Sequence, residues 1–146
     1  MIRWEQRLTD AGCRVTEPRR AVMQVLMNTQ APLAPLEILE RGSAIHPRLG
    51  LVTVYRTVML FEELNLAYRV HRSDGCHGYV ATSPGHHHHI ICRQCGRTVE
   101  FPGSEDLDLL IQQVEQRTDY QVDDHLLQLF GLCPGCRRKE IQKDDE

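Results

Sequence analysis

Apolar residues recur at helical spacing through the first half of the chain. The segment PRRAVMQVLMN, residues 18–28, has a partial amphipathic pattern, and APLEILERGSAI, residues 34–45, is a second, shorter helix candidate. After a turn at HPRLG, residues 46–50, the segment LVTVYRTVMLFEELNLA, residues 51–67, predicts a third helix. Its apolar stripe consists of Leu51, Val54, Val58 and Phe61.

The residues after this third helix have the pattern of a β-hairpin. AYRVHRSDGCHGYVAT, residues 67–82, has β-rich arms around Asp74-Gly75. Three helices followed by a hairpin are the plan of a winged helix, in which the start of the last helix faces DNA bases. Thr53 and Arg56 lie opposite the apolar stripe, with Tyr55 on its flank. A plain three-helix bundle with a solvated polar face fits the periodicity equally well.

The second half alternates strand and helix patterns. HHHHIICRQCGRTVEF, residues 86–101, predicts a strand, a knuckle and a strand, and YQVDDHLLQLFGLC, residues 120–133, a further strand. Between them, SEDLDLLIQQVEQRT predicts a helix capped by Ser104, with a stripe of Leu107, Leu110, Ile111 and Val114. The fold class is therefore α+β, and the polar tail after it should be frayed. We place a winged-helix domain at 1–82, a hinge at 83–85 and a second domain at 86–146.

Charge is divided unevenly between the halves. Residues 1–70 contain nine Arg and seven Asp or Glu, a net charge of +2, whereas residues 71–146 contain eight Lys or Arg and thirteen acids, a net charge of −5. The positive first half is weak support for nucleic acid binding. No apolar run approaches the roughly 20 residues of a membrane helix. The first ten residues lack the apolar stretch of a secretory signal, so we expect a cytoplasmic protein.

Four of the six cysteines form two Cys-x-x-Cys pairs, Cys92/Cys95 and Cys133/Cys136. In a reducing compartment such cysteines are metal ligands or reactive thiols rather than disulfides. Two knuckles can wrap one Zn²⁺ tetrahedrally, which fills every position and makes the site structural. A redox-active pair is the alternative, but such pairs usually come singly and precede a helix.

Four consecutive histidines, His86 to His89, run into the first cysteine pair. In a strand, His86 and His88 share one face and His87 and His89 the other, which is the spacing that two imidazoles need to hold one metal. A solvated polar loop is the alternative, but the following IIC extends the strand into the knuckle and favours ligands. Further ligand candidates are His71, Cys76, His77, Glu100, Glu105, Asp106, Asp108 and His125.

A ligand from the hairpin would connect the two domains through a metal, so that metal occupancy would set the angle between them. Cys76 bears on the identity of this metal, because a thiolate favours Zn²⁺ over Fe²⁺ or Mn²⁺. The alternative is that Cys76 is a small, partly buried hydrophobe at a turn.

The segments GCRVTEPRRAVMQVL, GLVTVYRTVMLFEELNL and HHHHIICRQCGRTVEF and the terminal CPGC resemble, in order, the ferric uptake regulator (Fur) superfamily. The resemblance covers nearly the whole chain. It implies a homodimeric, metal-responsive repressor with an N-terminal winged-helix DNA-binding domain and a C-terminal α/β dimerisation domain. The expected partner is an AT-rich palindromic DNA operator.

The resemblance also implies a role for each candidate site residue. The structural zinc ligands are Cys92, Cys95, Cys133 and Cys136. The interdomain sensor site comprises His87 and His89, to which we add Cys76 and, in preference to His77, His71. The second metal site comprises His86, His88, His125 and an acid, for which Glu105 ranks ahead of Asp106 and Glu100. The DNA contacts are Arg14, Thr53, Tyr55 and Arg56.

Two departures from iron-type members favour zinc as the regulatory metal. The stretch QAPLAPLE has no histidine, and Val80 stands near the hairpin position where those members have a glutamate. Cys76 is instead similar to the zinc-sensing (Zur) branch. We therefore expect a zinc-responsive repressor of zinc uptake genes, with an iron-, manganese- or peroxide-responsive regulator as the alternative.

Two interpretations from other classes explain less of the sequence. A zinc deaminase needs His-x-Glu beside Pro-Cys-x-x-Cys, and HHHHIIC has no glutamate at that offset. We therefore do not expect an enzyme. A zinc-storage module that does not bind DNA leaves LVTVYRTV unexplained.

Overall fold

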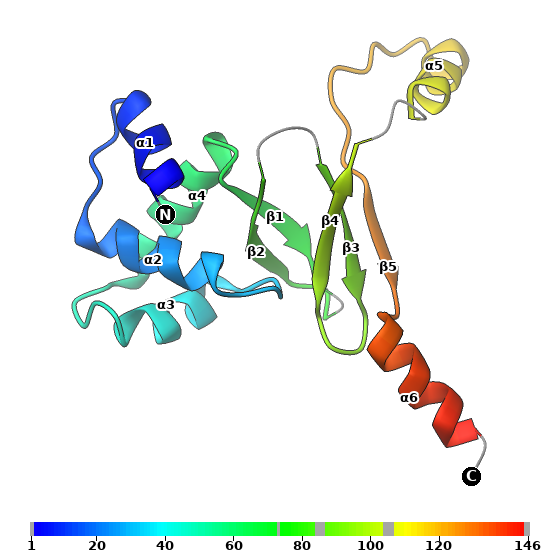
Figure 1. Cartoon of the computed structure of the whole chain (residues 1–146). Helices are drawn as coiled ribbons and strands as arrows, with labels where there is room; N and C mark the ends of the chain where they lie inside the picture. The colour runs from blue at the N-terminus through cyan, green and yellow to red at the C-terminus, as the bar shows by residue number, and fades with distance from the viewer. Residues whose placement is uncertain (1, 73, 84–86, 104–106, 145–146) are drawn as a thin grey trace.

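The computed structural model describes residues 2–72, 74–83, 87–103 and 107–144. The elements along these residues, in chain order, are α1 (Ile2–Asp10), α2 (Glu17–Met27), α3 (Pro35–Ser43), α4 (Leu51–Glu63), β1 (Ala67–His71), β2 (His77–Ala81), β3 (His87–Cys92), β4 (Thr98–Pro102), α5 (Leu107–Thr118), β5 (Gln128–Gly131) and α6 (Pro134–Asp144) (Figure 1). The predicted cap Ser104 and residues 84–85 of the predicted hinge lie outside the described residues. No helix among those described is long and apolar enough to cross a membrane.

The first domain is a winged helix in which α2, α3 and α4 surround one core. Val54, Val58 and Phe61 of α4 are completely buried, which confirms the apolar stripe of the third predicted helix. The predicted hairpin is confirmed as the antiparallel pair β1–β2. Leu33, between α2 and α3, adds a short bridge to Tyr79 of β2 and ties the helices to the hairpin.

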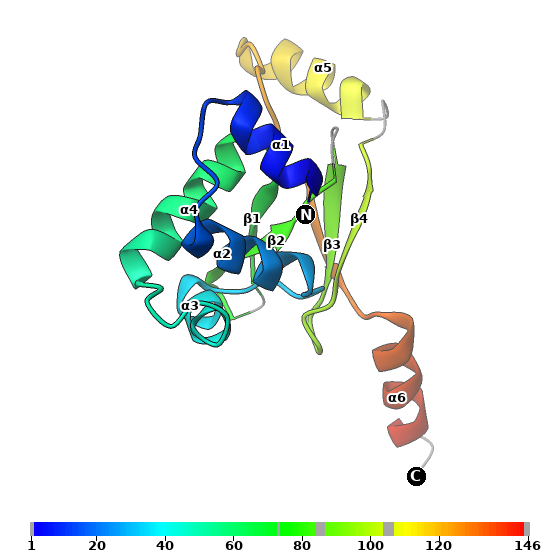
Figure 2. The ribbon, with the colours of Figure 1, turned by 60° about the vertical axis from the view of Figure 1, so that its left-hand side comes forward.

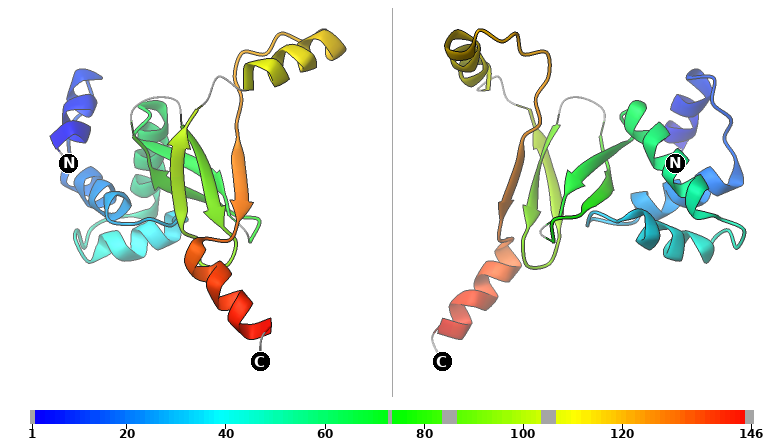
Figure 3. Two further views of the ribbon diagram at one scale, coloured as in Figure 1. Left: turned by 45° about the vertical axis from the view of Figure 1, so that its right-hand side comes forward. Right: turned by 180° about the vertical axis from the view of Figure 1, so that it is seen from behind.

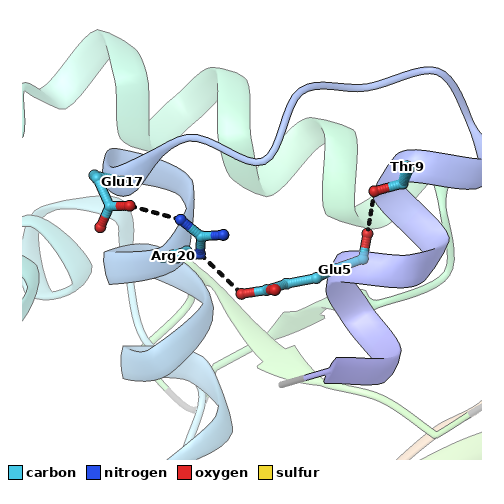
Figure 4. Close-up of polar contacts among 4 residues, drawn as sticks. All are labelled: Glu5, Thr9, Glu17 and Arg20. Carbon is cyan, nitrogen blue, oxygen red and sulfur yellow. Dashed lines mark hydrogen bonds and ion pairs between the residues drawn. The ribbon is translucent and has the colours of Figure 1, made fainter.

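A fourth helix, α1, was missing from the prediction of three helices. It packs on the others through Trp4, whose ring meets Phe61 edge-on at a centroid distance of 5.2 Å, and through the fully buried Leu8. Arg20 of α2 donates a hydrogen bond to Glu5 of α1 (Figure 4). The two buried apolar residues of α1, Trp4 and Leu8, stand only one turn apart. This is too little periodicity to predict a helix from the sequence.

The second domain is built on a three-stranded sheet in the order β4-β3-β5. The central strand β3 is antiparallel to β4 and parallel to β5. A parallel pair needs a crossover connection, and α5 lies within it. The predicted strand, knuckle, strand and helix are therefore confirmed, but the last strand, predicted over 120–133, is limited to β5. A further helix that the sequence did not predict, α6, covers Pro134–Asp144, and the last two residues of the tail KDDE, which was expected to be frayed, lie outside the described residues.

The apolar stripe predicted for α5 is not covered within the described chain. No residue of α5 is buried, and Leu110 and Val114 are 54% and 41% exposed. Helices α5 and α6 lie at opposite ends of the three-stranded sheet (Figures 1, 2 and 3), and Figures 1 and 3 show both of them away from the helices of the first domain.

The hairpin β1–β2 lies between the helices and the three-stranded sheet (Figures 1 and 3). Val70 and Val80 of the hairpin form a small buried cluster with Ile91 of β3, and Tyr68 packs against it. The backbone N–H of Thr98 also donates to the carbonyl of Gln30. One face of β3 therefore contacts the winged helix directly.

Candidate metal centres and DNA-binding face

The four cysteines of the two Cys-x-x-Cys pairs come together at the end of the sheet. Cys92 closes β3, and the parallel partner strand β5 leads into Cys133, with Cys136 in the first turn of α6. The four sulfur atoms all lie within 4.8 Å of one another, and the Sγ atoms of Cys95 and Cys133 are 3.8 Å apart. Two sulfurs bound to a tetrahedral Zn²⁺ at about 2.3 Å lie roughly 3.8 Å apart, so the arrangement fits this metal.

Backbone N–H groups point at two of these sulfurs. Cys133 N–H donates to Cys92 Sγ at 3.3 Å, and Cys136 N–H donates to Cys133 Sγ at 3.4 Å. These donors lower the pKa of the Cys92 thiol to about 6 and also lower the pKa of Cys133. The Cys133 side chain in turn raises the pKa of Cys136 to about 12. The cluster thus favours the thiolate form of Cys92 and Cys133 but opposes the ionisation of Cys136. A bound divalent cation would make this last ionisation favourable.

His89 and Glu100 face each other across the β3–β4 pair on the side of the winged helix. They are register partners, and His89 Nε2 lies 3.8 Å from Glu100 Oε1. The His89 ring is 1% exposed and stacks on Tyr68 of β1 at a centroid distance of 5.0 Å. Its Nε2 atom is buried and has no hydrogen-bond partner. By strand alternation His87 lies on the same face, so β3 presents both histidines to the hairpin.

The protonation of this pair suits a metal. Burial lowers the pKa of His89, and the nearby Glu100 carboxylate offsets this only in part, so the imidazole is neutral at pH 7. Burial opposes the ionisation of Glu100, but hydrogen bonds from Thr82 and Ser83 outweigh it and hold the pKa of Glu100 below its usual value. A neutral imidazole and an ionised carboxylate are the forms that bind a divalent cation.

The two hairpin residues assigned to the sensor site, His71 and Cys76, lie away from His89. On β1, His71 is three residues from Tyr68, which contacts His89, and so points to the other face of the hairpin. The His71 ring contacts His77 instead, and Cys76 is exposed at the hairpin tip. The structure therefore brings the strand pair and the hairpin pair to different places.

The opposite face of β3 carries the described part of the predicted second site. His88 is 2% exposed, and its ring lies 5.4 Å from that of His125 and 5.5 Å from that of Phe101. His86, Glu105 and Asp106 lie outside the described residues. Glu100 was a lower-ranked candidate for the acid of this site. It lies on the other face of the sheet, because it pairs with His89 in the β3–β4 register.

The predicted DNA contacts gather at one end of the winged helix. Arg14, Thr53 and Arg56 line a single open hollow of about 480 Å³, together with Arg19. No acidic side chain is among the described residues that line it. Tyr55 is exposed on the same helix, α4. A helix face with several arginines and without acids is an electrostatic match for a phosphate backbone.

Two residues of these sites were not assigned to them from the sequence. Glu100 belongs with His89 because the knuckle is tight, with Cys92 N–H donating to Arg97 C=O, which fixes the strand register. Counting residues from this turn along both strands pairs His89 with Glu100, so the sequence contained a signal for this contact. Arg19 follows Pro18 at the start of α2. Only the packing of α2 against α4 brings it to the hollow that Arg14, Thr53 and Arg56 line.

The sequence matches the model of the ferric uptake regulator family over residues 10–130. The chain is 35% identical to a ferric uptake regulation protein of Legionella pneumophila, an alignment that covers 90% of this chain and 97% of that protein. It is 29% identical to the peroxide operon regulator of Bacillus subtilis, with 91% and 90% of the two chains covered.

Solved structures give the same result for the fold. A zinc uptake regulator complexed with zinc and DNA superposes with a TM-score of 0.80 at 19% identity, covering 96% of this chain and 94% of that chain. The ferric uptake regulator from Francisella tularensis with iron superposes with a TM-score of 0.64 at 28% identity, covering 86% and 96%. The first likeness concerns the fold alone.

We predict that Cys92→Ser removes zinc from the four-cysteine cluster and unfolds the second domain, because the thiolate is the metal ligand. Cys13→Ser, which lies outside the cluster, is the matched control. Zinc content by mass spectrometry and thermal unfolding by circular dichroism are the readouts. In the unaltered chain, zinc retention should fall as the pH is lowered, since protons compete with the metal for the four thiolates. Full zinc content in the variant would contradict the assignment.

Proposed function

Because the chain belongs to the ferric uptake regulator family, whose members are metal-responsive regulators, we propose that it is a homodimeric DNA-binding repressor with Zn²⁺ as its co-repressor. The observation that carries the proposal is the buried, unpartnered Nε2 atom of His89 beside the Glu100 carboxylate. A buried imidazole nitrogen without a partner is costly, and a metal would satisfy it.

We propose His87, His89 and Glu100 as the core of the sensor site. The cavity at this place is lined by His89 and Glu100 from the sheet, by Val80 and Ala81 from β2, and by Thr29 and Gln30 that follow α2. It therefore lies on the seam between the two domains. When bound there, a metal would supply positive charge to an imidazole and a carboxylate that the protein already holds in metal-binding form.

Glu100 connects this site to the linker between the domains. Its Oε1 atom accepts hydrogen bonds from the Thr82 hydroxyl and, at 2.9 Å, from the Ser83 N–H. Thr82 and Ser83 directly follow β2, the second strand of the wing. Anything that changes the charge around Glu100 therefore acts on the residues that set the angle of the winged helix.

The donor set bears on the metal. Gln30 and Val80 line the cavity, near the positions at which iron-type members are expected to have a histidine and a glutamate. The cavity therefore offers few protein ligands to a metal. A small number of ligands suits Zn²⁺, which is stable with three or four. Two histidines and one carboxylate also match the facial triad of Fe²⁺ sites, so an iron-responsive regulator is the second candidate. His71 and Cys76 would join the site only if the hairpin moved.

The remaining site assignments have distinct roles in the proposal. The four cysteines form the structural zinc site, and four thiolates leave no open position on a tetrahedral ion, which supports a structural rather than catalytic role. His88 and His125, with His86 and an acid such as Glu105, form the second metal site on the far face of β3.

We propose that the outer face of the sheet is the dimer interface. Register pairing places Ile90, Val99 and Leu129 on one face of three adjacent strands. These side chains are 40%, 51% and 43% exposed in the single chain. The uncovered stripe of α5 is a second apolar surface. A second copy of the chain would bury both, and two winged helices related by a two-fold axis match a palindromic, AT-rich operator.

We predict that Glu100→Gln weakens metal-dependent DNA binding. The amide keeps an oxygen for Thr82 and Ser83 but loses the charge that attracts a cation. The free Zn²⁺ concentration for half-maximal binding of an operator duplex, measured by fluorescence anisotropy, should rise at least about tenfold. His89→Ala should act in the same direction, and His46→Ala, in the turn before α4, serves as the control.

The same assay separates the competing metals and ligand sets. Binding at far lower Zn²⁺ than Fe²⁺ or Mn²⁺ supports the zinc co-repressor, and the reverse order supports the iron or manganese alternative. A weakened zinc response in Cys76→Ser would place this thiolate in the sensor site. An unchanged response removes it.

We predict that Arg56→Ala lowers operator affinity by about 1–3 kcal/mol, since Arg56 is exposed on α4 and faces the arginine-lined hollow. Arg138→Ala removes the same charge from the exposed surface of α6 and is the matched control. Anisotropy titrations at several salt concentrations measure both. Equal effects of the two substitutions would show that only net charge matters at this face.

We predict that Val99→Asp converts the protein to a monomer, because it places a charge in the middle of the apolar sheet face. Val52→Asp, on the exposed side of α4 and far from the sheet, should leave the dimer intact. Analytical ultracentrifugation distinguishes the two species. A dimeric Val99→Asp variant would mean that another surface mediates assembly.

A further inference from the structure

A second pair of histidines, His71 and His77, lies apart from the His87, His89 and Glu100 site proposed above. His71 ends β1 and His77 begins β2, and the two are direct partners in the hairpin register. Both side chains are exposed, and the rings are in contact with a centroid distance of 4.4 Å. Their Nε2 atoms are 3.2 Å apart. The pair is therefore held by the strand pairing itself rather than by a flexible loop.

This separation has two chemical interpretations. Without a metal, one ring must donate its proton to the other, so the pair shares one hydrogen bond. Two nitrogens bound to a tetrahedral Zn²⁺ at about 2.0–2.1 Å lie roughly 3.3 Å apart, close to the observed distance. A divalent metal could thus replace the shared proton with little movement of either ring.

The surroundings of the pair favour a cation. His71 and His77 line an open pocket of about 410 Å³ with Glu62, Asp124 and Arg69, so that two carboxylates face one guanidinium. Tyr68 and His125 complete its polar lining. Asp124 is exposed and lies in 119–127, a segment that forms neither helix nor strand. It supplies a carboxylate from the second domain to a histidine pair from the first.

The pocket is anchored next to the pair. The Gln128 side chain of β5 brackets the main chain of His71, accepting from its N–H at 3.0 Å and donating to its carbonyl at 2.6 Å. This double hydrogen bond fixes the end of the wing to the second domain four residues after Asp124. Among the described residues, only the four cysteines form a group of three or more ligands whose ligand atoms already lie within 4.8 Å of one another. Asp124 must therefore shift to meet both histidines.

We propose that His71, His77 and Asp124 form a further binding site for a divalent cation of the zinc type. Bound there, the ion joins the end of the wing to segment 119–127, in a pocket that His89 does not line. The site is separate from the four-cysteine cluster and from the His87–His89 pocket, and it requires neither DNA binding nor a zinc-specific repressor.

His77→Ala is the diagnostic substitution, because His77 belongs to no other proposed site. The full-length chain, with zinc kept in the four-cysteine cluster and other metals removed, is titrated with Co²⁺, and bound metal is counted by equilibrium dialysis. We expect one Co²⁺ per chain fewer in His77→Ala than in the unaltered protein, or binding of that ion weakened at least about tenfold. His46→Ala should bind as the unaltered protein does.

Two further variants test the link between domains. Asp124→Asn should weaken the binding of the same ion, whereas Asp123→Asn, the same substitution at the exposed neighbouring residue, should leave it in place. Unchanged Co²⁺ binding in His77→Ala overturns the site. Loss in His77→Ala with no effect of Asp124→Asn overturns the interdomain link and leaves a histidine pair confined to the hairpin. NMR provides an independent readout of ligation. Addition of Zn²⁺ should change the chemical shifts of the His71 and His77 rings and leave those of the His46 ring unchanged.

Discussion

The position of β3 between β4 and β5 is the constraint on which both histidine faces depend. A strand exposes alternate residues to opposite sides, so a run of histidines in β3 necessarily serves two different environments. One side meets the hairpin through Ile91 and His89, and the other carries His88 beside His125. A slip of one residue would exchange the two sets. The tight turn between β3 and β4, in which Cys92 N–H donates to Arg97 C=O, fixes the register and prevents this exchange.

The same constraint gives the seam between the domains its chemical character. Most of its contacts are polar or aromatic: Tyr68 on His89, Glu100 with the linker, and Gln128 around the backbone of His71. The apolar part is the small cluster of Val70, Val80 and Ile91. Since interfaces of this size and polarity permit domain motion, the angle of the winged helix can respond to a charge placed beside Glu100. The helices that carry Arg56 pack on this hairpin through Leu33 and Tyr79, so a change in the angle of the hairpin would also change the position of the proposed DNA contacts.

Much of this arrangement could be predicted from the sequence because it rests on local patterns. The stripe of α4, the hairpin at Asp74-Gly75 and the strand-knuckle-strand of β3 and β4 each have a strong periodic or turn signal. Helices α1 and α6 have no such periodic or turn signal, because α1 buries only two residues, one turn apart, and α6 is polar. The separation of the hairpin candidates from His89 was missed for a different reason. Ligand type suggested His71 and Cys76, but strand alternation turns His71 away from the face on which Tyr68 meets His89.

The separation of the hairpin residues from His89 changes the argument about the metal. A thiolate at the sensor site would have selected zinc by its softness. With Cys76 at the hairpin tip, the selection must rest on coordination number instead. His87, His89 and Glu100 offer three donors, and Gln30 and Val80 add no strong ligand. Such a site would suit Zn²⁺, which is stable with three or four ligands, whereas six-coordinate Fe²⁺ or Mn²⁺ would need more donors than these side chains supply. The small number of protein donors therefore favours the ion with the smaller shell.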